Sequence, residues 1–262
     1  MTPKALLNTL NRKKTVEIIA VCLQFLTLAT IVIAAAAITL SASKAAATTA
    51  SARTYAVFVA VFNRHTQEAR GGIAGTAFFT SASHAITAYH VLQKASFRPQ
   101  NAIETVQIWL VHENEAAIEL KPEHLSEDAS KDLTRISLGT DTKVPRRYIF
   151  ELSQGTPASD VKTEGFLAHS IGPVLRINAG KLSIVSVPRL SRLHAHGLLE
   201  RSSTIHLQAN DVKLSGAPCL RLSYRPVVGL SGGPVIAANG KVIGMNSFAD
   251  PTTRAHTWAI AF

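Results

Sequence analysis

The sequence from residue 54 onward alternates between short apolar runs and polar breaks, which is typical of β-strands separated by turns. Asn239-Gly240 stands between two apolar runs and predicts a β-hairpin there. Only residues 145–154 and 190–200 carry a weak helical pattern. About a dozen strands and so few helices predict an all-β fold, either a barrel or a sandwich. The predicted strands are TYAVFVAVF (54–62), GTAFFTS (75–81), HAITAY (84–89), ETVQIWLVH (104–112), LTRISL (133–138), VKTEGFLA (161–168), GKLSIVSV (180–187), TIHLQA (204–209), LRLSY (220–224), GPVIAA (233–238), KVIGMNSF (241–248) and HTWAIAF (256–262).

A different pattern occupies the N-terminus, where residues 18–40 form an apolar block without a charged residue. As a helix this block would be roughly 34 Å long, enough to cross a hydrocarbon core about 30 Å thick. It also exceeds the apolar region of about 7–15 residues in signal peptides, which favours a retained transmembrane anchor. The small residues that follow it are compatible with cleavage, so removal of the segment stays an alternative.

The charges that flank this block predict its orientation. Four lysines and arginines precede it within residues 1–17, and the positive-inside rule therefore places that N-terminal stub in the cytoplasm. Residues 41–53, SASKAAATTASAR, are small and mostly uncharged and predict a linker. We expect residues 54–262 to form one extracytoplasmic domain, periplasmic or extracellular, of a single-pass membrane protein.

The composition is basic, with 27 lysines and arginines against 17 aspartates and glutamates and a net charge of +10. Residues before 54 carry half of that excess, and the other charges are scattered without interleaved aromatic residues. This distribution argues against a nucleic-acid partner. Cys22 lies in the apolar block, so it is poorly placed for a disulfide with Cys219. No cysteine or histidine spacing predicts a metal site.

The stretch GLSGGPVIAANGKVIGMNS surrounds Ser231 with glycines, which let the backbone approach a substrate oxygen closely. The similar stretch KLSGAPC contains Ser215 but lacks the upstream glycine, so we predict Ser215 to lie in a turn. GLSGG also matches the G-x-S-x-G nucleophile elbow of α/β-hydrolases. That fold needs a helix after the serine, whereas a hairpin follows Ser231 and only 31 residues remain. We therefore reject the elbow.

A nucleophilic serine needs a hydrogen-bonded base and a carboxylate that orients the base. His90 ends the predicted hairpin GTAFFTSASHAITAYH, where a strand end can hold an imidazole in place. Asp132 stands directly before the predicted strand LTRISL and is the candidate acid, with Asp128 as the alternative. The order histidine, acid, serine differs from that of the α/β-hydrolases.

Three stretches, GTAFFTSASHAITAYHVL, DASKDLTRISL and GLSGGPVIAANGKVIGMNS, resemble the signature blocks of trypsin-like, chymotrypsin-fold serine proteases, in the same order. The disulfide-poor HtrA (Deg) protease domain is the most similar type, and ASDVKTEGF and AGKLSIVS also resemble parts of it. The resemblance spans residues 54–262. It implies two six-stranded antiparallel β-barrels and a serine endopeptidase that cleaves proteins or peptides without a cofactor or metal.

The resemblance also implies a role for each matching residue. Ser231 would be the nucleophile, His90 the general base and then acid, and Asp132 the group that orients the imidazole. The backbone N–H groups of Gly229 and Ser231 would form the oxyanion hole. A candidate specificity pocket would lie near four further residues, of which Arg225 or His256 would favour acidic or amide substrate side chains. These four are Arg225, Asn246, Ala249 and His256.

The sequence departs from the family pattern at several positions. Tyr89 replaces a small residue before the histidine, which would change the packing behind the imidazole. Leu230 stands where digestive proteases have an aspartate that pairs with a newly cut N-terminus, so we expect no activation of that kind. We also expect neither a C-terminal helix nor a PDZ domain. A catalytically inactive, protease-like binding domain at the membrane is therefore the alternative function, and no oligomeric state is predicted.

Overall fold

The computed structural model describes residues 53–93, 99, 101–139, 142–153, 160–168, 173–178, 181–209, 212–252 and 254–262. The predicted N-terminal stub, transmembrane segment and most of the linker lie outside this part of the chain. Within the described part, no helix combines the length and apolar character needed to cross a membrane.

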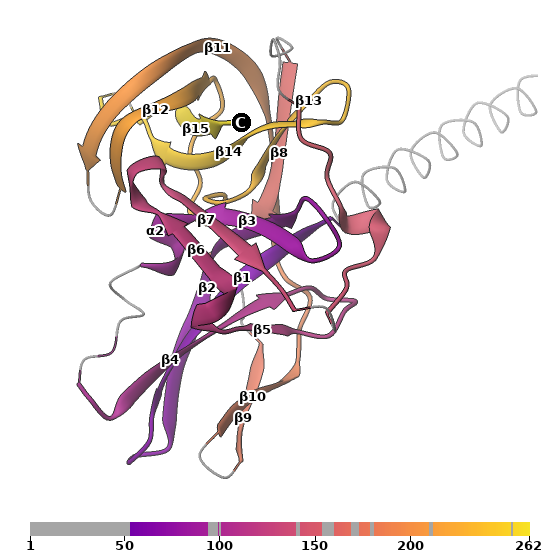
Figure 1. Ribbon diagram of the computed structural model, residues 1–262, viewed down its shortest axis with the longest axis vertical. Helices are drawn as coiled ribbons and strands as arrows, with labels where there is room; N and C mark the ends of the chain where they lie inside the picture. The colour runs from indigo at the N-terminus through magenta and orange to yellow at the C-terminus, as the bar shows by residue number, and fades with distance from the viewer. Residues whose placement is uncertain are drawn as a thin grey trace, which may run out of the picture. The chain divides into compact units, whose positions relative to one another are not determined.

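The described residues form β-strands joined by turns, with one short α-helix (Figure 1). The helix α2 covers Tyr89–Leu92, and three short 3-10 turns cover Pro122–His124, Ala129–Lys131 and Arg146–Tyr148. The strands are β1 (Thr54–Asn63), β2 (Glu68–Phe79), β3 (His84–Ala88), β4 (Glu104–Val111), β5 (Ile118–Leu120), β6 (Leu125–Asp128), β7 (Leu133–Ser137), β8 (Asp160–Phe166), β9 (Val174–Asn178), β10 (Lys181–Ser186), β11 (Arg192–Ala209), β12 (Val212–Leu222), β13 (Pro234–Ala237), β14 (Val242–Ala249) and β15 (Thr257–Ala261).

The first half of the chain forms a seven-stranded antiparallel sheet in the order β5-β4-β1-β2-β3-β7-β6. Strand β1 is buried along almost its whole length, which explains why its sequence is apolar without alternation. Tyr55, Val57 and Val59 pack into one core cluster, whereas Phe58 and Phe62 face a second cluster that includes Trp109 and Leu182. The sheet is therefore covered on both faces at β1.

The second half closes into a six-stranded barrel in the order β11-β12-β15-β14-β13-β8. Inside it, apolar side chains such as Val161, Leu222 and Val235 form a third core cluster. Strands β9 and β10 form a separate two-stranded hairpin between β8 and β11 in the sequence. The all-β prediction is confirmed. The first expected six-stranded barrel is instead an open seven-stranded sheet, because its two edge strands, β5 and β6, do not pair with each other.

Three local predictions were wrong. Residues 190–200 are mostly β-strand, because β11 pairs along Arg192–Leu198 with β8 and this pairing overrides their weak helical pattern. Of the segment 145–154, the described residues 145–153 contain the 3-10 turn Arg146–Tyr148 and no α-helix. Ser215 lies inside β12 and not in a turn, next to a β-bulge at Gly216, whose φ is +72°.

Candidate active site

His90 and Asp132 form a buried pair at one end of the seven-stranded sheet. His90 lies in α2, directly after β3, and Asp132 precedes β7, which pairs with β3. The Asp132 carboxylate accepts hydrogen bonds from the His90 backbone N–H at 2.9 Å and from Nδ1 at 2.9 and 3.0 Å. Asp132 adopts a left-handed conformation, which aspartate tolerates better than most residues. Because the carboxylate can only accept, these contacts assign the hydrogen to Nδ1 and leave Nε2 as the acceptor in the neutral ring.

Asp128, the alternative acid, makes different contacts. Its carboxylate accepts a hydrogen bond from Ser130 Oγ at 2.6 Å and lies 3.4 Å from the Lys131 ammonium. The Ser130 hydroxyl and Lys131 hold the pKa of Asp128 below its ordinary value. The carboxylate that contacts His90 is therefore that of Asp132.

Ser247 in β14 is a polar contact that the sequence reasoning missed. Its hydroxyl donates to Asp132 Oδ2, and its carbonyl accepts a hydrogen bond from Ser231 Oγ at 3.2 Å. Ser247 therefore links the carboxylate of the seven-stranded sheet to the serine of the barrel. No local motif distinguishes Ser247 from other serines in strands, because its partner is 115 residues away in the sequence.

Ser231 lies between β12 and β13, against β2. Its carbonyl accepts a hydrogen bond from the Thr76 N–H at 2.8 Å. A side chain at Gly75 would meet both the Ser231 carbonyl, at 2.7 Å, and Val91, at 2.6 Å, so Ser231 packs next to the neighbour of His90. His90 and Ser231, both within the described part of the chain, share no hydrogen bond, since the Ser231 hydroxyl donates to Ser247.

The loop before Ser231 leaves two backbone donors unused. Among the described residues, neither the N–H of Gly229 nor that of Ser231 donates a hydrogen bond. The Val228 carbonyl accepts from the Ala168 N–H at 3.2 Å. In a trans peptide the carbonyl and the next N–H point in opposite directions, so the Gly229 N–H points away from Ala168. Two unpaired N–H groups beside a serine are an arrangement that can bind an anionic oxygen.

Glycine is required at position 229 for two reasons. Its φ is +111°, and a Cβ there would come within 1.8 Å of the Phe166 carbonyl oxygen. Thr76 holds the same loop from the other side, because its hydroxyl donates to the Gly229 carbonyl at 2.7 Å and accepts from the Phe166 N–H at 3.2 Å. The loop conformation thus depends on contacts with β2 and β8.

Two departures from the family pattern have clear positions. The Leu230 side chain is buried, and its Cδ2 lies 3.1 Å from the place a Cβ at Gly165 would take. This position therefore holds an apolar contact where digestive proteases have a carboxylate. Tyr89 is partly buried at the start of α2.

The four residues of the candidate specificity pocket have different surroundings. Asn246 is buried, and its amide bonds with the Tyr224 hydroxyl and the Thr163 hydroxyl, both at 2.5 Å. Ala249 is partly exposed at the end of β14, and Arg225 is exposed. No charged partner contacts the Arg225 guanidinium within the described ranges. The Asn246 amide is thus part of the barrel interior, whereas Arg225 is accessible.

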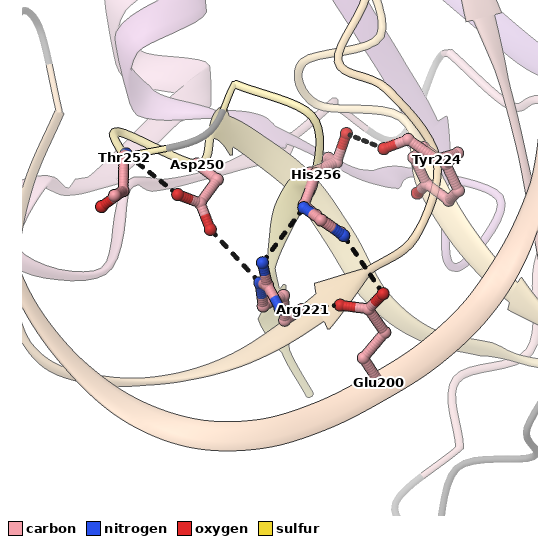
Figure 2. Close-up of polar contacts among 7 residues, drawn as sticks. Glu200, Arg221, Tyr224, Asp250, Thr252 and His256 are labelled. Atoms are coloured by element: carbon pink, nitrogen blue, oxygen red, sulfur yellow. Dashed lines mark hydrogen bonds and ion pairs between the residues drawn. The ribbon is translucent and has the colours of Figure 1, made fainter.

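His256 belongs to a charged cluster centred on Arg221 (Figure 2). The guanidinium uses all three nitrogens: Nε lies 3.2 Å from Asp250, one terminal nitrogen 2.9 Å from Glu200, and the other 3.0 Å from His256 Nδ1. Because arginine only donates, His256 Nδ1 must accept, and Nε2, at 3.2 Å from Glu200, carries the hydrogen. Both ring nitrogens of His256 are therefore engaged within the protein.

Glu164 in β8 is a buried carboxyl near the Ser231 loop. It is 4% exposed, its Oε1 has no hydrogen-bond partner within the described residues, and its backbone carbonyl lies against Gly233. Burial raises the pKa of Glu164 to about 7, although the positive charges of Arg192, Arg53 and Lys162 oppose the shift. Its cross-strand neighbour is His194, whose pKa burial lowers.

The described residues contain no group of three or more histidine, cysteine, aspartate or glutamate side chains that could hold a metal ion. Cys219 is a free thiol buried in the core, and burial raises its pKa to about 12. Its thiolate is therefore disfavoured, which argues against Cys219 as a nucleophile.

Comparison with known proteins gives structural matches only. No protein-family model and no curated protein sequence matches the chain. The HtrA-type protease AlgW with a decapeptide is 13% identical, with a TM-score of 0.51 over 80% of this chain and 61% of AlgW. AlgW with a tripeptide is 15% identical, with a TM-score of 0.50 over 80% of this chain and 56% of AlgW. The Rv3671c protease from M. tuberculosis, active form, is 16% identical, with a TM-score of 0.49 over 81% of this chain and 77% of that one.

The chain thus spans less than two thirds of each of these AlgW chains. At these identities the similarity concerns the fold alone. The chain therefore has the chymotrypsin-type fold of the HtrA-type serine proteases.

Proposed function

We propose that the chain is a serine endopeptidase in which Ser231, His90 and Asp132 form the catalytic triad. The observation that carries the proposal is the buried Asp132 carboxylate on His90 Nδ1, linked through Ser247 to Ser231. His90 Nε2 would take the proton of the Ser231 hydroxyl as Oγ attacks the scissile carbonyl carbon. The proton would then pass to the leaving amine, and water would hydrolyse the acyl-enzyme by the same route.

The unpaired N–H groups of Gly229 and Ser231 would bind the oxyanion that forms during attack. Each such donor contributes roughly 3–4 kcal/mol to lowering the barrier in serine proteases. Peptide substrates are supported by two AlgW neighbours, whose structures are described as containing a tripeptide and a decapeptide.

The second candidate function is an inactive protease-like domain that binds polypeptides. One observation favours it: the Ser231 hydroxyl donates to the Ser247 carbonyl and not to His90. Catalysis requires the hydroxyl to rotate about its single χ1 bond toward Nε2, whereas a binding domain does not. The two functions therefore differ in whether Ser231 reacts.

A fluorophosphonate probe tests this difference directly. Its reaction joins Ser231 Oγ to phosphorus with loss of fluoride, and His90 accepts the hydroxyl proton. We expect labelling of the full-length chain and of Ser215→Ala, which removes the serine of the similar KLSGAPC stretch. Ser231→Ala and His90→Ala should not be labelled. Equal labelling of the wild type and Ser231→Ala, or no labelling of folded wild type, would contradict the proposal.

Cleavage preference is a separate part of the proposal. Arg225 is exposed and six residues before Ser231, so its free guanidinium would favour acidic or amide side chains at the cleavage site. A peptide library should then show such a preference, and Arg225→Ala should reduce it. Cleavage after small aliphatic residues that is unchanged in Arg225→Ala and His256→Ala would contradict this specificity.

We also propose that residues 18–40 anchor the protein in a membrane, with residues 1–17 cytoplasmic and the β domain extracytoplasmic. The support is the uncharged apolar block and its basic flank. Protease added to intact spheroplasts should digest the β domain. Digestion only after the membrane is permeabilised would contradict this orientation.

A further inference from the structure

Thr76 in β2 contacts the loop of residues 227–231, which carries the two unpaired N–H groups. Its hydroxyl donates to the Gly229 carbonyl at 2.7 Å, and its backbone N–H donates to the Ser231 carbonyl at 2.8 Å. The hydroxyl also accepts from the Phe166 N–H at 3.2 Å. Thr76 is fully buried, so water does not compete for these hydrogen bonds. Thr76 thus binds the carbonyls of both residues whose N–H groups are unpaired within the described ranges.

The peptide group between Gly229 and Leu230 connects the two peptide groups that carry the unpaired N–H groups. A peptide group is planar, so a contact on its carbonyl also fixes the direction of its N–H. The Thr76 hydroxyl therefore holds the peptide group that sets the angle between the two donors. Further backbone contacts of the loop run from the Leu230 N–H to the Val227 carbonyl at 3.1 Å, from the Ala168 N–H to the Val228 carbonyl at 3.2 Å and from the Gly233 N–H to the Leu230 carbonyl at 2.8 Å.

The loop depends on such a contact because its own residues do not fix its conformation. Gly229 has a φ of +111°, and glycine adopts either sign of φ at little cost. Leu230 is apolar and buried, so it cannot anchor the loop by an ion pair, as the corresponding aspartate of digestive proteases does. The Thr76 hydroxyl instead supplies a donor from outside the loop, on a strand of the seven-stranded sheet.

We propose that Thr76 is a positioning residue for catalysis, whose hydroxyl keeps the N–H groups of Gly229 and Ser231 in the orientation that binds the oxyanion. The inference rests on the proposed catalytic function and concerns how its oxyanion hole is maintained. Thr76 acts through the Gly229 carbonyl and not on the substrate. Without the hydroxyl, the Gly229 carbonyl and the Phe166 N–H lose their shared partner in a buried place. The loop then turns to pair them, and the two donors move.

The rate of fluorophosphonate labelling of the full-length chain tests this role, because the phosphoryl oxygen occupies the oxyanion hole while Ser231 Oγ attacks phosphorus. Thr76→Val keeps the shape of the side chain and removes the hydroxyl. It should slow labelling about ten- to a hundredfold, as expected for misplaced oxyanion donors. Thr76→Ser restores the hydroxyl and should restore most of the rate.

Thr54→Val is the matched control, since Thr54 is a fully buried threonine of β1 whose hydroxyl has no hydrogen-bond partner among the described residues. Its labelling rate should equal that of the wild type. The midpoint of the pH dependence of labelling should be the same in Thr76→Val and the wild type, because the Thr76 hydroxyl bonds to the loop and to Phe166 and leaves the His90–Asp132 contacts in place.

Urea unfolding verifies that each variant is folded under the assay conditions. If Thr76→Val does not fold, Thr76→Cys, whose thiol is only a weak donor, must show the slower labelling. Equal rates for the wild type and the folded Val or Cys variant, equally slow labelling of Thr76→Ser, or a shifted pH midpoint would overturn the positioning role and leave the catalytic proposal standing. Absence of labelling in folded wild type would overturn both.

Discussion

Replacing the buried Glu164 with glutamine should make the protein more stable at high pH and change its stability less at low pH. The carboxyl is 4% exposed and its pKa rises from 4.5 to about 7 on folding. Between pH 4.5 and about pH 7, Glu164 keeps its proton in the folded chain but has lost it in the unfolded chain. The stability contributed by Glu164 therefore falls as the pH rises through this window. Glutamine has a similar shape and does not ionise.

The size of the rise in the Glu164 pKa determines how much the stability of the folded state changes with pH. At 1.36 kcal/mol per pH unit, ionised Glu164 costs the folded state about 3 kcal/mol at pH 8. About 2.5 kcal/mol of this penalty develops between pH 5 and pH 8, by the same linkage relation. The positive charges of Arg192, Arg53 and Lys162 favour the ionised carboxylate, and the pKa of Glu164 is raised to about 7 in spite of them.

Urea unfolding of the wild type and Glu164→Gln at pH 5 and pH 8 gives the comparison. The quantity of interest is the change in the stability difference between the two pH values, because any packing effect of glutamine is the same at both. Glu68→Gln, at an exposed position of β2, should show no such change. A stability difference between wild type and Glu164→Gln that stays constant from pH 5 to pH 8 would refute the reasoning.

Four further predictions concern single contacts. Ser247→Ala should lower kcat/KM of a peptide substrate about ten- to a hundredfold, because Asp132 loses a hydroxyl donor; unchanged kcat/KM would exclude a positioning role. Gly229→Ala should lower the free energy of unfolding by at least about 3 kcal/mol or abolish probe labelling, whereas Gly139→Ala, with open space around it, should do neither. Arg221→Met should lower the free energy of unfolding by about 2 kcal/mol, because Glu200 and Asp250 lose their cation, and Arg221→Lys should not restore it fully; equal stability of Arg221→Met and wild type would exclude a stabilising role. In a Cys22→Ser background, Cys219 should react with a thiol reagent only when urea unfolds the chain, and fast native labelling would contradict its burial.

The strands that the sequence predicts well are those whose side-chain pattern reflects burial. Residues 54–62 are apolar throughout because β1 is covered on both faces, and Asn239-Gly240 stands in the turn between β13 and β14. One misassigned segment is 190–200, where exposed and partly buried positions alternate in β11 but few residues favour strands. Its strand conformation comes from pairing with β8 and β12, and such long-range pairing leaves little local signal.

The candidate site was predictable where a functional group lies within a local motif, as with His90 after its hairpin and Ser231 among its glycines. Ser247, Thr76 and Glu164 were missed because their contacts join distant parts of the chain. Thr76 and Gly229 are 153 residues apart, yet the Thr76 hydroxyl donates a hydrogen bond to the Gly229 carbonyl. A single sequence gives no indication that a threonine in β2 supports a loop of the six-stranded barrel.

The two Ser-Gly-x-Pro stretches show most directly how context determines the outcome. Both contain a glycine with positive φ after the serine, Gly216 at +72° and Gly232 at +82°. In β12 the flanking residues pair with β11, so the glycine forms only a bulge against His206 in a continuous strand. Around Ser231, Gly229 adopts a further positive φ, and Thr76 and Asn246 bind the backbone of residues 229–232 and prevent it from joining a strand. The local tetrapeptide thus permits a tight backbone, and the contacts from β2 and β14 decide whether the N–H groups of residues 229 and 231 remain unpaired beside a serine.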